Sequence, residues 1–67
     1  MATFYYNGNE VSRTYALNKS LHLAQEYGSD INEALAIFKR AEQDNDDGEY
    51  ARDDIGNVTN QEIEVVI

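Results

Sequence analysis

Acidic side chains are concentrated in one stretch of this chain, residues 42–54, which reads Glu-Gln-Asp-Asn-Asp-Asp-Gly-Glu-Tyr-Ala-Arg-Asp-Asp. Seven carboxylates and one arginine give this stretch a net charge of −6, out of −8 for all 67 residues. Clustered carboxylates suit two kinds of chemistry. They can bind a metal cation, or they can form a surface that imitates the phosphates of a nucleic acid.

Residues 44–48, Asp-Asn-Asp-Asp-Gly, resemble the start of a helix-loop-helix calcium loop. That motif requires oxygen ligands at positions 1, 3 and 5, glycine at position 6 and a bidentate glutamate at position 12. Placing Gly48 at position 6 puts Gln43 at position 1 and Asp54 at position 12, so two strong ligands are lost or shortened. We therefore expect no dedicated metal site and no cofactor.

Groups suited to nucleophilic or acid-base catalysis are scarce, because the chain has one histidine, no cysteine and only three serines. Ser20 and His22 are two residues apart on a predicted helix, and side chains at that spacing do not face each other. A chain of this length also offers little scaffold for a concave pocket. We expect a protein that is not an enzyme.

The second chemistry of the acidic stretch is electrostatic. A net charge of −8 repels phosphate backbones and anionic lipids and favours basic partners, so we expect neither direct nucleic-acid binding nor a membrane role. The alternative is a solvated loop whose charge only keeps a small protein soluble. If the stretch is an interface, with an exposed tyrosine as its aromatic anchor, the partner-binding residues are Glu42, Asp44, Asp46, Asp47, Glu49, Tyr50, Asp53 and Asp54.

Three strands are predicted around this stretch. Residues 3–14 form a hairpin, because β-forming residues precede Asn7-Gly8, the dipeptide that best supplies a type I′ turn. In that register Phe4 lies opposite Val11 on the inward face. Residues 61–67 alternate in polarity and are rich in β-branched side chains, so they predict a C-terminal strand.

Two amphipathic helices are predicted between the strands, at about 15–27 and 30–43, with Gly28 closing the first and Ser29 or Asp30 capping the second. Residues 42–54 carry too much like charge to continue a helix and are predicted to form an acidic loop. The chain is thus expected to be one α+β domain, 1–67, in the order β-β-α-α-β, with two helices on one face of a three-stranded sheet.

The junction between the two predicted helices resembles the turn of a helix-turn-helix motif. Residues 28–35 also resemble the last turn and helix of ubiquitin-associated domains, without their first helix and signature loop. The exposed start of the second helix carries Asn32 and Glu33, which does not suit a DNA-reading helix. We favour a tight connection that packs two helices.

A short acidic chain without catalytic groups, built as a compact α+β domain, is similar to small phage-encoded inhibitors of bacterial defence, the anti-CRISPR and DNA-mimic proteins. The resemblance is one of type and covers no shared motif, so no residue role is carried over. It implies a stoichiometric inhibitor that occupies the Lys/Arg-lined nucleic-acid channel of a nuclease or CRISPR surveillance complex.

Two functional hypotheses result. The first is a non-catalytic inhibitor whose acidic surface blocks a basic site on a DNA- or RNA-handling protein. The second is a structural or regulatory module that forms a homodimer or binds a partner through exposed tyrosines among Tyr5, Tyr6 and Tyr15. The lack of cysteine and of a signal-peptide pattern predicts a cytoplasmic protein, located in the bacterial host cell if a phage encodes it. The longest apolar run, residues 34–38, is far shorter than the ~20 residues that span a bilayer.

Overall fold

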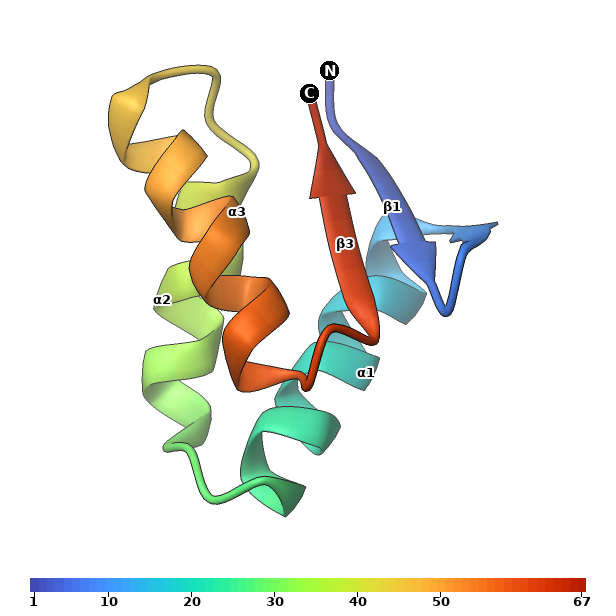
Figure 1. Cartoon of the computed structure of the whole chain (residues 1–67), viewed down its shortest axis with the longest axis vertical. Helices are drawn as coiled ribbons and strands as arrows, with labels where there is room; N and C mark the ends of the chain where they lie inside the picture. Colours follow the sequence, from blue (N-terminus) through green and yellow to red (C-terminus); the bar gives the residue numbers. More distant parts are fainter.

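The computed structural model describes all residues, 1–67, as one α+β domain with three strands and three helices. The α+β class predicted from the sequence is confirmed. Figure 1 shows α2 and α3 side by side, α3 next to β3, and the two chain ends close together. In chain order the elements are β1 (Thr3–Tyr6), β2 (Asn9–Val11), α1 (Arg13–Glu26), α2 (Ile31–Ala41), α3 (Asp46–Val58) and β3 (Ile63–Val66).

The sheet is antiparallel, with the strand order β2-β1-β3. Phe4 lies opposite Val11, as its register predicted, and opposite Val65 on the other side. The turn between β1 and β2 has φ values of 48° at Asn7 and 85° at Gly8, which confirms the predicted left-handed conformation at both turn residues.

The helices cover the face of the sheet that carries Phe4, and they leave the opposite face open. Phe4 is buried and its ring stacks on that of Phe38 from α2, with the centroids 5.5 Å apart. Ile55 from α3 and Ile63 from β3 complete the centre of this core, where both are almost fully buried. Glu10 and Glu64, on the other face of the sheet, are exposed.

The first two helices begin at side-chain caps. Ser12 Oγ accepts a hydrogen bond of 3.1 Å from the Tyr15 N–H, and Asp30 Oδ1 accepts one of 3.1 Å from the Asn32 N–H. Both contacts satisfy N–H groups that have no partner within a helix. A left-handed Gly28, with φ of 92°, follows α1, so the tight helix-helix connection predicted from the sequence is present.

The prediction of a loop at residues 42–54 was wrong, because α3 begins at Asp46 and continues to Val58. The helix is capped by Asn45, whose Oδ1 accepts a hydrogen bond of 2.7 Å from the Gly48 N–H. Three of the carboxylates occupy the first turn, where the positive end of the helix dipole attracts negative charge. Ala51 and Ile55 then bury one side of the helix in the core. The observed order is therefore β-β-α-α-α-β, with three helices on the sheet rather than two.

Candidate functional site

The exposed side of α3 carries five carboxylates. Asp46, Glu49 and Asp53 are spaced three and four residues apart, which aligns them along one stripe of the helix. Asp47 and Asp54 form a neighbouring stripe. All five side chains are exposed, and Tyr50, which is 71% exposed, lies among them.

The charge density along this surface is close to that of a nucleic acid. Asp46 and Asp54 are separated by about 12 Å along the axis, at about 1.5 Å per residue. Five carboxylates over that length leave four intervals, or about one charge per 3 Å, compared with one per about 1.7 Å in duplex DNA and one per about 3.4 Å along one DNA strand. The helix therefore presents a charge density between that of one strand of duplex DNA and that of the whole duplex.

The only cation of residues 42–54, Arg52, is engaged with the backbone of the preceding helix end. Its Nη1 donates hydrogen bonds to the carbonyl oxygens of Ala41, at 3.1 Å, and Gln43, at 2.8 Å. Carbonyls at the C-terminal end of a helix lack partners within the helix and attract positive charge. Arg52 thus binds the chain at and after the end of α2, and the charged side chains on the outer side of α3 are all acidic.

Two of the eight predicted partner-binding residues lie outside α3. The Glu42 carboxylate accepts hydrogen bonds from the Arg13 Nε and, at 2.9 Å, from the Arg13 Nη2. These bonds and the charge of Glu42 raise the pKa of the Arg13 guanidinium. Glu42 is half-buried and already paired with Arg13, so it is less available to a partner protein than the exposed carboxylates of the stretch. Asp44 is exposed in the turn between α2 and α3, and the other six residues gather on α3.

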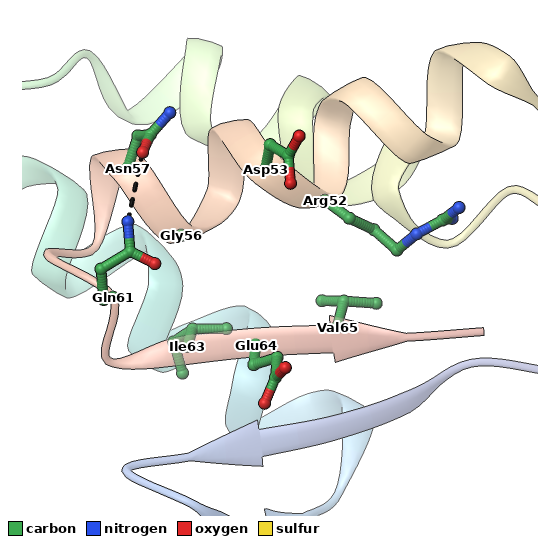
Figure 2. A pocket seen from close by; sticks show the side chains of 8 residues that line it. All are labelled: Arg52, Asp53, Gly56, Asn57, Gln61, Ile63, Glu64 and Val65. Atoms are coloured by element: carbon green, nitrogen blue, oxygen red, sulfur yellow. Dashed lines mark hydrogen bonds between the residues drawn. The ribbon is translucent and has the colours of Figure 1, made fainter.

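A groove between α3 and β3 was missed by the sequence analysis, because it exists only if residues 46–58 form a helix. Figure 2 shows α3 on one side of the groove and β3 on the other. Its volume is about 640 Å³. A hydrogen bond of 3.2 Å from the Gln61 Nε2 to the Asn57 Oδ1 lies at one end of the groove. The lining residues include Arg52, Asp53 and Gly56 from α3 and Ile63, Glu64 and Val65 from β3.

The residues considered for catalysis lie apart. Ser20 is fully buried in α1 and its Oγ has no hydrogen-bond partner, whereas the His22 side chain is 71% exposed and lies 3.8 Å from the Glu26 carboxylate. Residues two positions apart in a helix are rotated by about 200° around its axis, so the side chains of Ser20 and His22 point to different sides of α1. No group of three or more His, Asp or Glu side chains is arranged to hold a metal ion.

The tyrosines of the second hypothesis do not form one surface. Tyr5 and Tyr6 are consecutive in β1 and point to opposite faces of the sheet. The Tyr6 ring packs against Tyr15, with the centroids 5.9 Å apart, and the Lys19 Nζ lies 5.0 Å from the centroid of the Tyr6 ring. Tyr5 lies on the open face, opposite Glu10 and Glu64. An interface that uses all three rings would have to wrap around the sheet.

Tyr27, which follows α1, connects that helix to the segment before β3. Its hydroxyl donates a hydrogen bond of 2.7 Å to the Glu62 Oε2. This bond raises the pKa of the Tyr27 phenol, because deprotonation would remove the donor and place two negative charges side by side.

Replacing Tyr27 with phenylalanine is expected to lower the melting temperature at neutral pH, but not at strongly alkaline pH. The folded protein holds the Tyr27 proton more tightly than the unfolded chain, in which the pKa is near 10.0. The stabilisation is therefore complete below that pH and is lost as the pH rises through the folded-state pKa. Thermal melts of both proteins across this range measure the effect. Tyr50→Phe, which removes an exposed hydroxyl, is the control, and a Tyr27→Phe difference that does not change with pH would contradict the prediction.

No helix of this protein has the length and apolar character needed to cross a membrane. No protein-family model, curated protein or solved structure matches the chain.

Proposed function

We propose that this protein is a non-catalytic inhibitor that presents the exposed side of α3 to a basic, nucleic-acid-binding site on another protein. The observation that supports this proposal most strongly is the arrangement of charge on α3. Five carboxylates lie on its exposed side with a spacing close to that of nucleic-acid phosphates, while Arg52 is bound to the carbonyls of Ala41 and Gln43.

A helix makes this acidic surface more effective than a flexible loop would. The backbone between Asp46 and Asp54 is already ordered, so binding does not have to order it. The carboxylates then act in two ways: their field speeds the approach of a basic partner, and each can accept hydrogen bonds from Lys or Arg. Tyr50 supplies a rigid aromatic group at the centre, which is the side-chain type enriched at energetically important interface positions.

The inhibitor would act by competition. A site that binds the phosphates of DNA or RNA through Lys and Arg cannot hold α3 and the nucleic acid together. A CRISPR surveillance complex or a bacterial nuclease has such a site and fits the resemblance to phage-encoded inhibitors. The protein itself is proposed not to bind duplex DNA, because its surface has the same sign of charge.

The test compares two variants with the same net charge of −5, three units less negative than the parent at −8. The interface variant carries Asp47→Asn, Glu49→Gln and Asp54→Asn. The control carries Glu10→Gln, Glu26→Gln and Glu33→Gln, which are exposed carboxylates away from α3. Each exposed charge should contribute about 0.2 to 1 kcal/mol, so the interface variant should bind roughly 3- to 150-fold more weakly than the parent.

The assay is inhibition of target-DNA binding by a panel of bacterial nucleases and CRISPR surveillance complexes, with circular dichroism to verify folding. We expect the parent and the control variant to inhibit at least one complex. The interface variant should inhibit it less, with the larger change in association rate at low salt. If the two variants inhibit equally, net charge alone is responsible. If the parent inhibits no complex, the proposal fails, and an interaction module with a charged surface is the better account.

A further inference from the structure

β3 is an edge strand, and the phase of its hydrogen bonds shows which groups it leaves open. It pairs only with β1, and Figure 2 shows it lying between β1 and α3. The Asn7 N–H donates to the Glu62 carbonyl at 2.8 Å, so the pairs Tyr5–Glu64 and Thr3–Val66 are hydrogen-bonded in turn. The N–H and C=O of Val65 therefore point away from β1, along the free edge.

Ile63, two residues before Val65 and with the same backbone orientation, confirms this hydrogen-bonding pattern. The Ile63 N–H also points away from β1, and it donates to the Thr59 Oγ1 at 3.3 Å. Thr59 thereby closes one end of the edge, at the side where α3 ends. What remains open to a ligand is a short backbone array, consisting of the Ile63 carbonyl and the N–H and carbonyl of Val65.

The groove places this array opposite a small residue of α3. Gly56 lines the groove and is buried, and the side-chain amide of Gln61 packs against it, with its Oε1 2.8 Å from where a Cβ of residue 56 would lie. The Gln61 N–H donates to the Gly56 carbonyl at 2.7 Å, which holds the turn between α3 and β3 in place. The groove is thus formed before any ligand arrives.

The charges around the groove favour a basic occupant. Asp53 lines its α3 side and Glu64 its β3 side, and both are exposed. Arg52, the one cation at the groove, is bound to the carbonyls of Ala41 and Gln43. A second copy of this chain is a poor occupant, because joining two β3 strands would set two Glu64 carboxylates opposite or diagonal to each other between molecules of net charge −8.

We propose that the groove between α3 and β3 binds an extended, lysine- or arginine-containing segment of the partner protein, which adds to the sheet as a fourth strand beside β3. One residue of the segment pairs with Val65 through two backbone hydrogen bonds, and its side chain points to the same face of the sheet as that of Val65, beside α3. Its two neighbours point to the open face of the sheet, where a basic side chain lies against Glu64. The proposal rests on the proposed function only for the basic character of the partner.

The probe is a capped hexapeptide of alternating lysine and valine, titrated against the full chain at low salt while the backbone amides are followed by NMR. We expect the largest shift and the greatest slowing of hydrogen exchange at Val65. N-methylation of the valines removes the N–H groups that face β3 and should weaken binding about tenfold or more, whereas N-methylation of the lysines should not. Equal binding of the two methylated peptides would overturn the proposal, as would shifts confined to the carboxylates of α3.

Charge reversal provides a second arm. Glu64→Lys should weaken binding of the unmethylated peptide about tenfold. Glu10→Lys makes the same change on the same face of the sheet, but on β2, and should have a much smaller effect. The interface variant at Asp47, Glu49 and Asp54 separates the two proposals, because it should inhibit the nuclease less but keep the Val65 response to the peptide. If Val65 is already protected in the protein alone and the mass is that of a dimer, the occupant is a second copy and the proposal is wrong.

Discussion

Replacing Phe38 with alanine is expected to leave the protein largely unfolded at room temperature. The Phe38 side chain is fully buried, stacks on Phe4, and lies beneath the guanidinium of Arg13, which is 5.7 Å from the ring centroid. Truncation of a buried phenylalanine to alanine costs about 3 to 5 kcal/mol. A chain of this length has a total stability of about 3 to 10 kcal/mol, so the loss is comparable with the whole.

Urea unfolding followed by circular dichroism measures this effect. Tyr50→Ala is the matched control, because it removes an aromatic ring that is 71% exposed and should change stability by only about 0.5 kcal/mol. Phe38→Leu keeps most of the apolar volume and should stay folded with an intermediate loss. If Phe38→Ala unfolds at the same urea concentration as Tyr50→Ala, then the layer between the sheet and α2 is not the core described above.

Gly48→Ala is expected to destabilise the protein by about 1 to 3 kcal/mol, although alanine is normally the better helix former by about 1 kcal/mol. Gly48 is the third residue of α3, and a Cβ built there would lie 1.9 Å from the Gln43 carbonyl oxygen and 2.8 Å from its carbonyl carbon. Both are backbone atoms of the turn that joins α2 to α3. To make room, α3 would have to move away from that turn and from the Asn45 cap.

Gly56→Ala is the same substitution in the same helix, but it should not destabilise the protein. A Cβ at Gly56 would meet only the side-chain amide of Gln61, whose Oε1 is 2.8 Å away and can rotate aside. We therefore expect Gly56→Ala to be neutral or to stabilise the protein by up to about 1 kcal/mol. Thermal or urea unfolding of the two variants provides the comparison. If both substitutions stabilise the protein, then Gly48 does not pack against the backbone of Gln43 as described above.

The elements that the sequence predicted correctly depend on contacts between residues close together in the chain. The Asn7-Gly8 turn sets the register of β1 and β2, because a two-residue turn leaves one pairing that keeps Phe4 and Val11 on the same face. The break at Gly28 likewise follows from the backbone preference of a single residue. α1 itself begins at Arg13, two residues before the predicted start at about residue 15, because Ser12 caps it. These preferences act whatever the rest of the chain does.

The acidic stretch was mispredicted because its net charge was weighed without regard to where each charge falls along a helix. Asp46 and Asp47 follow the cap at Asn45 and are favoured by the helix dipole there. The apolar spacing of Ala51, Ile55 and Val58 is a helical signal, but it is short and surrounded by carboxylates. Burial of Ala51 and Ile55 against α2 and β3 makes the helix the stable form. Those contacts are with other elements of the fold, so the local sequence does not show them.

An acidic α+β domain, its hairpin register, two of its helices and the residues that carry its charge could all be predicted from the amino-acid sequence, because composition, turn chemistry and helical periodicity are local properties. Which charges face outward depends instead on how the elements pack against one another. Arg13 and Glu42 are 29 residues apart and pair because α1 and α2 pack together. Arg52 is held by two carbonyls, that of Ala41 at the end of α2 and that of Gln43 in the turn after it. The groove between α3 and β3 likewise exists only once both elements pack on the same core, because it is the space left between them.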